Sequence, residues 1–212
     1  MIAQPDAKYR ITYSMQLMPN LLPGIGHRQG TIWITGLSGA GKTTLSHALR
    51  KRMLAAGHPV LLLDGDEMRA GLNRDLGFSD ADRTENIRRA AEVAKLANRS
   101  GLWVVAAFIS PLRSQRQQAR EIIGSDAFLE VFLSASFAVC AQRDAKGLYA
   151  KASAGQISQF TGLSAPYEAP FAPDLEIDTE VVGPEQAADL ICEALARSSA
   201  RGTLSATRPL PR

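Results

Sequence analysis

Eight consecutive residues near the start of the chain have the spacing of a phosphate-binding loop. They read Gly36-Leu37-Ser38-Gly39-Ala40-Gly41-Lys42-Thr43 and match the pattern G-x-x-x-x-G-K-[S/T]. Glycines in such a loop let successive backbone N–H groups turn toward one anion, and the lysine reaches the β- and γ-phosphates of a nucleotide. The threonine hydroxyl is a ligand for Mg²⁺. We therefore expect these residues and the following Thr44 to bind ATP, with Thr43 as a metal ligand.

The segments on either side of this loop supply a strand and a helix. Residues 31–35 (T-I-W-I-T) predict a buried strand, and residues 44–56 predict a helix that closes at Gly57. The N-terminus of this helix adds partial positive charge beside the phosphates. A glycine-rich turn without a ligand has no need of Lys-Thr directly before a helix, so the order of these elements favours a nucleotide site.

Two carboxylates follow the next predicted strand, residues 59–63. Asp66 could orient or deprotonate an acceptor hydroxyl, or hold Mg²⁺ through water, and Asp64 is the neighbouring candidate for the same roles. We assign Asp66 to the reaction and Asp64 to the metal. The sequence Asp-Gly-Asp is also good turn and helix-capping chemistry, and that alternative stays open, more so for Asp64 than for Asp66.

The rest of the chain alternates strands with helices. Further strands are predicted at residues 102–109, 128–133 and 175–179, and helices at 82–98, 112–123, 137–143 and 184–197. A short helical stretch is also predicted from the turn at 64–66 to about residue 74. Such alternation predicts an α/β fold, a three-layer sandwich of the P-loop NTPase type, with a mainly parallel sheet and helices on both faces. Ligands of these sheets bind at the carboxyl ends of the strands. The glycine- and proline-rich residues 144–173 predict an irregular lid over that edge.

Length and charge indicate one domain without a nucleic-acid partner. The chain has 212 residues and a net charge of +3, which suits a core at 30–196 between an arm or linker at 1–29 and a disordered tail at 197–212. Four arginines and no acidic residue lie in the tail, so the core itself is not basic. No apolar run reaches the ~20 residues of a membrane span. We find no signal peptide, and Cys140 and Cys192 lack metal-ligand spacing, so we expect a cytoplasmic protein.

Several longer motifs resemble the adenylylsulfate kinase family. They extend from about residue 30 to about residue 179, in the order in which the family has them. These motifs are Asp64-Gly65-Asp66-Glu67-Met68-Arg69-Ala70-Gly71-Leu72-Asn73, Asp75-Leu76-Gly77-Phe78-Ser79, Asp82-Arg83-Thr84-Glu85-Asn86-Ile87-Arg88-Arg89, Ile109-Ser110-Pro111, Arg143-Asp144-Ala145-Lys146-Gly147-Leu148-Tyr149 and Phe160-Thr161-Gly162. The resemblance implies a phosphotransferase that uses Mg²⁺ and ATP to phosphorylate adenosine 5′-phosphosulfate at its ribose 3′-hydroxyl.

The resemblance also implies a role for individual residues. Lys42, Asp66, Lys146 and Ser110 are expected to act in catalysis, and Arg143 and Val182 to contact the ATP adenine. The substrate-binding set comprises Asp66, Arg69, Phe78, Arg83, Asn86, Ile109, Ser110, Lys146 and Phe160, in which Phe78 and Phe160 form two halves of a clamp on the substrate adenine.

Two roles are considered for the Ser110 hydroxyl. The family serine is described as a phosphoserine intermediate, whereas phosphoryl transfer in line needs only positioning and neutralisation of charge. Since the sequence places no histidine base beside Ser110, we favour a hydroxyl that binds substrate.

Alternatives to this activity come from the same fold. A GTPase is disfavoured because the chain has no N-K-x-D tetrad. A P-loop kinase for another nucleotide would need a different acceptor pocket, and a non-catalytic nucleotide-sensing domain would not need Lys42, Thr43, Asp66 and Lys146 together. The resemblance further implies a homodimer, and it suggests association or fusion with ATP sulfurylase, which makes the substrate.

Overall fold

The structure, a computed structural model, describes residues 29–144, 147–157 and 159–205. Within these residues a parallel sheet has the strand order β2-β3-β1-β4-β5. The strands are β1 (Thr31–Thr35), β2 (Val60–Asp64), β3 (Trp103–Ala107), β4 (Phe128–Ser134) and β5 (Leu175–Asp178). All lie within about two residues of the segments predicted as strands, because each is a short apolar run bounded by turn residues.

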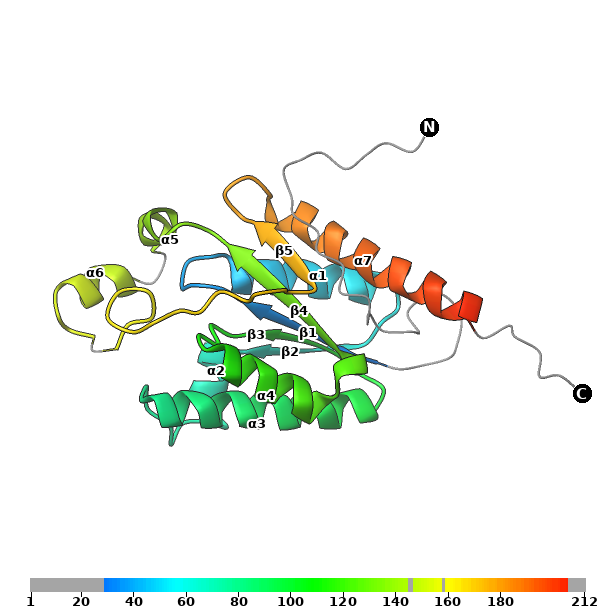
Figure 1. Cartoon of the computed structure of the whole chain (residues 1–212), viewed down its shortest axis with the longest axis horizontal. Helices are drawn as coiled ribbons and strands as arrows, with labels where there is room; N and C mark the ends of the chain where they lie inside the picture. The colour runs from blue at the N-terminus through cyan, green and yellow to red at the C-terminus, as the bar shows by residue number, and fades with distance from the viewer. Residues whose placement is uncertain (1–28, 145–146, 158, 206–212) are drawn as a thin grey trace, which may run out of the picture.

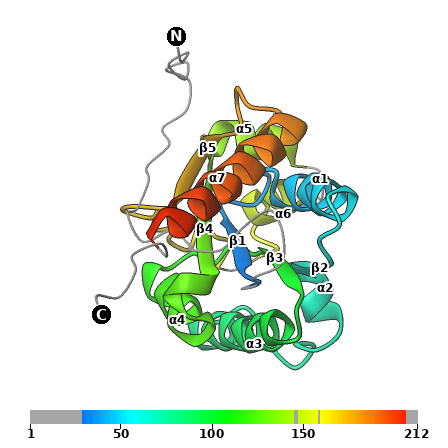
Figure 2. The ribbon, with the colours of Figure 1, turned by 90° about the vertical axis from the view of Figure 1, so that its right-hand side faces the viewer.

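Helices cover both faces of this sheet. They are α1 (Lys42–Ala55), α2 (Gly65–Ala70), α3 (Asp80–Arg99), α4 (Arg113–Ile123), the 3₁₀ turn η1 (Ser125–Ala127), α5 (Phe137–Arg143), α6 (Leu148–Ser153) and α7 (Pro184–Ser205). Figures 1 and 2 show α1 and α7 on one face and α3 and α4 on the other. The α5 and α6 helices lie beyond the arrowheads of β1 and β4, at the carboxyl edge (Figure 1). The predicted three-layer sandwich is confirmed.

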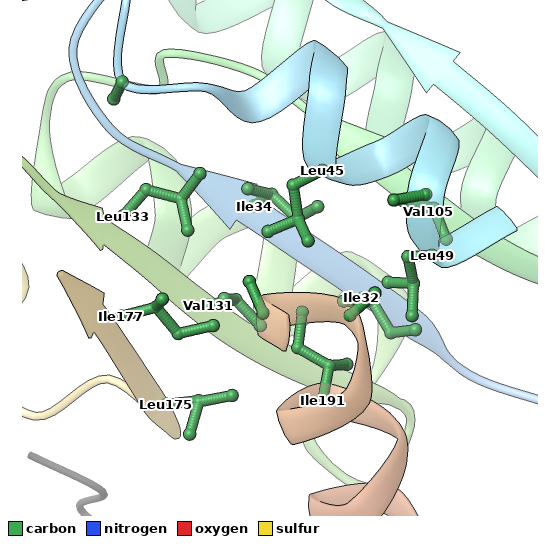
Figure 3. Close-up of a cluster of buried hydrophobic side chains, with 14 of the residues drawn as sticks. Ile32, Ile34, Leu45, Leu49, Val105, Val131, Leu133, Leu175, Ile177 and Ile191 are labelled. Atoms are coloured by element: carbon green, nitrogen blue, oxygen red, sulfur yellow. The ribbon is translucent and has the colours of Figure 1, made fainter. Parts of the chain in front are cut away.

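The central strand β1 is buried on both of its faces. Successive side chains of a strand point to opposite faces of the sheet. Ile32 and Ile34 therefore join the cluster formed with α1 and α7, which Figure 3 shows around Leu45 and Ile191. Trp33 points the other way, where its ring stacks on Phe108 with centroids 5.1 Å apart. Burial on both faces explains why β1 reads as a continuous apolar run.

The structure corrects the sequence analysis at three helices. The lid contains helix α6, whose first turn is capped by Asp144: its carboxylate accepts the N–H groups of Tyr149 and Ala150, each at 3.1 Å. The stretch predicted as helical to about residue 74 ends at Ala70 in α2. The last helix continues to Ser205 instead of ending near residue 197, so its backbone extends into the segment expected to be disordered.

Some expectations fall on residues that the structure does not describe. These are most of the arm at 1–29, Lys146 in the lid and the end of the tail from residue 206. Among the described residues, no helix combines the length and the apolar character needed to cross a membrane.

Candidate active site

Steric contacts explain why the phosphate loop between β1 and α1 needs two of its three glycines. A Cβ atom on Gly39 would lie 2.6 Å from the carbonyl oxygen of Cys140 in α5, and Gly39 has a φ of +78°. A Cβ atom on Gly36 would lie 2.7 Å from the carbonyl oxygen of Leu133. Because a real Cβ does not approach a backbone oxygen this closely, the loop can sit against β4 and α5 only with glycine at these positions.

Lys42 and Thr43 begin helix α1, and their side chains bind different parts of the site. Lys42 Nζ donates to the carbonyl oxygens of Gly36 at 2.9 Å and Leu37 at 2.7 Å, so its side chain lies along its own loop. Thr43 Oγ1 donates to Asp64 Oδ2 at 2.9 Å. The structure thus brings together the two side chains predicted to hold Mg²⁺, from the start of α1 and the end of β2.

Asp64 has two functions in this arrangement. Its Oδ1 atom accepts the N–H of Asp66 at 2.9 Å, which caps the N-terminus of α2 and confirms the capping alternative for this residue. Its Oδ2 atom faces Thr43, and a hydroxyl beside a carboxylate is a donor set that suits Mg²⁺. Among the described residues, no group of three His, Cys, Asp or Glu side chains is arranged so that it could hold a metal ion. A kinase Mg²⁺ needs only one or two protein ligands, because nucleotide phosphates supply others.

A cavity of about 480 Å³ opens from the phosphate loop along the carboxyl edge of the sheet. Most residues predicted to bind nucleotide or substrate form its wall. They are Ser38, Gly39, Ala40, Gly41, Lys42, Thr43, Thr44, Asp64, Asp66, Arg69, Phe78, Arg83, Asn86, Ile109, Ser110, Arg143 and Val182. The cavity therefore joins the predicted ATP side to the predicted acceptor side without a break.

On the acceptor side, two arginines flank an exposed aromatic ring. Phe78 is 59% exposed, and the guanidinium carbons of Arg69 and Arg83 lie 4.5 and 5.6 Å from its ring centroid. Burial lowers the pKa of both arginines, and the charge of Arg83 lowers that of Arg69 further. Two neighbouring cations, partly removed from water, favour binding of an anion between them.

Hydrogen bonds hold both arginines against the loop that precedes α3. Arg69 Nη1 donates to the carbonyl oxygen of Gly77 at 2.6 Å, and Arg83 Nε donates to that of Phe78 at 3.0 Å. Arg83 Nη2 also donates to the carbonyl oxygen of Gln159 at 2.7 Å, which links α3 to the lid.

Ser110 lines the cavity, but its hydroxyl is bonded within the protein. The residue is 2% exposed and has a φ of +38°, which is uncommon for a residue with a side chain. Trp33 Nε1 donates to Ser110 Oγ at 3.2 Å, and Ser110 Oγ donates to Thr35 Oγ1 at 3.0 Å. Arg116 Nη1 donates to the Ser110 carbonyl oxygen at 2.6 Å. These bonds hold the strained backbone and direct the hydroxyl toward β1.

On the nucleotide side, Arg143 closes the end of the cavity. Its Nη2 atom donates to the carbonyl oxygen of Thr179 at 2.6 Å, and its Nη1 atom donates to that of Gly39 at 3.4 Å. The guanidinium therefore bridges the phosphate loop and the chain after β5. Val182, which is buried, forms an apolar part of the same wall, as a site for a nucleobase requires.

Several predicted site residues do not take the expected place. Phe160 is 7% exposed and is absent from the cavity wall; its ring packs edge-on against Tyr149, with centroids 4.8 Å apart. The structure therefore does not bring Phe160 opposite Phe78. Asn86, by contrast, does line the cavity, with its Oδ1 atom occupied as the acceptor of the Asn73 Nδ2 hydrogen bond at 2.8 Å. Gly36 and Leu37 support the loop from outside the wall.

Two tyrosines to which the sequence analysis assigned no role connect the lid to the site. Tyr149 of α6 donates its hydroxyl to the carbonyl oxygen of Ser38 in the phosphate loop at 2.8 Å. The hydroxyl of Tyr167 lies 3.0 Å from Thr35 Oγ1, beside the Ser110 cluster. The available signal was a tyrosine in a polar, glycine-rich segment, because the hydroxyl of a tyrosine normally finds a hydrogen-bond partner when the ring is buried.

Comparisons with known proteins agree with this geometry. A model of the family described as "Adenylylsulphate kinase" matches residues 28–178. The chain is 50% identical over 170 residues to adenylyl-sulfate kinase of Prochlorococcus marinus. This match covers 80% of this chain and 85% of that protein. It is also 50% identical over 170 residues to "Bifunctional enzyme NodQ" of Azospirillum brasilense, a match over 80% of this chain and 27% of NodQ.

A solved structure gives the same result. The structure of the Mycobacterium tuberculosis APS kinase CysC in complex with AMPPNP and APS has a TM-score of 0.77 and 42% sequence identity. It covers 81% of this chain and 99% of that chain. A family model that spans most of the described residues, together with relatives of this identity, shows that the chain belongs to the adenylylsulfate kinase family.

Proposed function

We propose that this chain transfers the γ-phosphoryl group of ATP to the ribose 3′-hydroxyl of adenosine 5′-phosphosulfate (APS), giving 3′-phosphoadenosine 5′-phosphosulfate and ADP. The single observation that supports this most is the continuous cavity, in which Lys42 and Thr43 share a wall with Arg69, Phe78 and Arg83. Kinases of this kind work mainly by positioning and by neutralising charge, and one cavity provides both. The similar APS kinase CysC was solved with AMPPNP and APS together.

In this proposal the phosphate loop and two aspartates serve the transferred group. Thr43, and Asp64 through water, would hold Mg²⁺, which neutralises charge on the nucleotide phosphates when it is bound. Lys42 neutralises charge on the γ-phosphoryl group, and Asp66 accepts the proton of the 3′-hydroxyl. A bond forms between the ribose 3′-oxygen and the γ-phosphorus. At the same time the bond from that phosphorus to the β,γ-bridging oxygen of ATP breaks, and ADP leaves with this oxygen.

The acceptor is selected at the other end of the cavity. Arg69 and Arg83 bind the phosphosulfate, and the exposed ring of Phe78 stacks on the adenine. Ile109 and Ser110 form the floor below the ribose. We retain Phe160 as a clamp residue only for a closed state, in which it would have to leave its contact with Tyr149.

An assay of ADP release with three acceptors tests the proposal. APS is expected to be used far better than AMP or adenosine. Only APS carries a sulfate group on its 5′-phosphate, and the two arginines can bind that group. A preference for AMP or adenosine would support a kinase for another nucleotide. ATP binding without ADP release from any of the three would instead support the nucleotide-sensing alternative.

Domain limits, assembly and location are proposals of the same kind. We propose a kinase core at residues 30–196 with a lid at about 144–173 that carries Lys146 toward the phosphoryl group. A homodimer in the cytoplasm is the expected form. Association or fusion with ATP sulfurylase is supported by the match to part of the bifunctional NodQ.

A further inference from the structure

The loop that carries Phe78 has little apolar burial to hold it in place. This acceptor loop, residues 71–78, connects α2 to α3. Of its three large apolar side chains, Leu72 is 57% exposed, Phe78 is 59% exposed and Leu76 is half-buried. The position of the Phe78 ring therefore depends mainly on polar contacts.

Polar contacts secure both ends of the acceptor loop. Near its start, Asn73 is buried and donates through Nδ2 to Asn86 Oδ1 at 2.8 Å. Near its end, Arg69 Nη1 donates to the carbonyl oxygens of Leu76 at 3.3 Å and Gly77 at 2.6 Å. Asn86 and Arg69 belong to the proposed substrate site, so these two contacts are part of the machinery that binds the acceptor.

The middle of the loop is tied to α3 by a residue outside the cavity wall. Arg89 Nη1 and Nη2 donate to Asp75 Oδ1 and Oδ2, each at 2.8 Å, and Arg89 Nη1 also lies 3.4 Å from the carbonyl oxygen of Leu72. Two parallel hydrogen bonds between a guanidinium and a carboxylate fix orientation as well as distance. Arg89 is in turn oriented by Glu85, whose Oε1 accepts from Arg89 Nε at 2.9 Å.

We propose that Asp75 and Arg89 are positioning residues for the acceptor, which hold the loop so that Phe78 stays between Arg69 and Arg83. This inference rests on the proposed function, because it takes the Phe78 side of the cavity as the APS site. Neither Asp75 nor Arg89 lines the cavity, so their effect on substrate is transmitted through the loop. Hydrogen bonds from Arg89 lower the pKa of the Asp75 carboxyl, so the pair remains charged at neutral pH.

Arg88 provides a matched control on the same helix. It donates to both oxygens of Glu85, from Nε at 2.7 Å and from Nη2 at 2.9 Å. Among the described residues, no hydrogen bond or ion pair joins Arg88 to the acceptor loop. Arg88→Gln and Arg89→Gln therefore remove the same charge and disturb the same Glu85, but only Arg89→Gln releases the loop.

The first measurement is steady-state kinetics on the full chain. Arg89→Gln and Asp75→Asn are each expected to raise the KM for APS about fivefold, the upper range for an exposed ion pair, with the KM for ATP within about twofold of wild type. The double variant should be no worse than Arg89→Gln alone, because the ion pair that Asp75→Asn removes is already lost in Arg89→Gln. Arg88→Gln should match wild type.

The second measurement reports on the loop without any substrate. Arg74 is exposed in the acceptor loop, so trypsin cleavage after Arg74 measures how often the loop opens. Arg89→Gln is expected to be cleaved there several times faster than Arg88→Gln, with circular dichroism confirming that both are folded. Asp75→Asn serves for the kinetics if Arg89→Gln does not fold.

The outcomes separate this inference from the proposed function. Equal cleavage of the two arginine variants, or faster cleavage with an unchanged KM for APS, would overturn the positioning role. Faster cleavage of Arg89→Gln in a protein whose wild type does not use APS would show that the tie exists and that the proposed function is what fails.

Discussion

Lys42 lies against the carbonyl oxygens of Gly36 and Leu37 in the structure, so its side chain must change partners when a nucleotide binds. Lys42→Ala is expected to lower the rate of phosphoryl transfer by at least ~10³, because it removes a positioned charge from the transferring group. The fold should survive, since the side chain is not part of the core. Steady-state kinetics check this, with Lys51→Ala on the exposed face of α1 as the control. More than about a tenth of the activity remaining would place the ATP site elsewhere.

Ser110 is expected to act through its contacts and not as a nucleophile. Ser110→Ala leaves the buried Trp33 Nε1 without its acceptor, so we expect a loss of stability of about 1–3 kcal/mol, a raised KM for APS and measurable turnover. Denaturant unfolding and kinetics measure the two effects. An obligatory phosphoserine would instead reduce activity by about 10⁴ or more. Phosphate on Ser110 that is chased into product would overturn our assignment.

Phe78 and Arg83 test the acceptor side directly. Phe78→Ala removes one stacking surface and should raise the KM for APS about ten- to hundredfold, with little change in the KM for ATP. Arg83→Ala should have a similar effect and should also improve AMP relative to APS, because it removes a charge assigned to the phosphosulfate. Equal weakening of ATP and APS in both variants would mean that these residues lie on the wrong side of the reaction centre.

At the scale of the element, helix α6 is linked to the phosphate loop through one hydroxyl. Tyr149 packs edge-on against Phe137 and Phe160 and donates to the Ser38 carbonyl oxygen. Burial raises the pKa of the Tyr149 hydroxyl, so the group is protonated at neutral pH and can donate this hydrogen bond. The contact gives the lid a direct means of stabilising the loop that binds ATP.

Tyr149→Phe removes this hydrogen bond and keeps the ring. We expect the KM for ATP to rise about fivefold, the effect of about 1 kcal/mol, with a smaller change in the KM for APS. Tyr167→Phe is the control: its hydroxyl contacts Thr35, near Ser110, and burial raises its pKa to about 12. If the two variants affected ATP equally, the hydroxyl of Tyr149 would have no particular role at the nucleotide.

At the scale of the whole molecule, we predict that the core does not need the arm to fold. A variant lacking residues 1–28 should keep its thermal midpoint within a few degrees and its turnover number within about twofold, because the described residues already bury β1 on both faces of the sheet. The arm carries Met15, Leu17, Met18, Leu21 and Leu22, which suit a contact between subunits. Light scattering should therefore show the truncated form as a monomer and the full chain as a dimer; loss of folding on truncation would contradict the proposed limits.

The sequence alone determined the order of the elements and the chemistry of the loop. Strand β1 was predicted at its observed bounds, and α1 was predicted to within two residues of its start. Both depend on local patterns, which are apolar runs, turn glycines and fixed spacings within one stretch of chain. The pairing of Arg88 or Arg89 with Glu85 was also predictable, because residues three and four apart share one face of a helix.

The tertiary structure alone decided which partner each distant side chain takes. Trp33 meets Ser110 across 77 positions because β3 lies beside β1 in the sheet, and Tyr149 meets Ser38 across 111 because α6 folds over the phosphate loop. Phe160 packs against Tyr149 instead of facing Phe78, a contact that the fold of the lid itself decides. Residue types at such separations carry no spacing rule, since the distance between them is set by the packing of whole strands and helices.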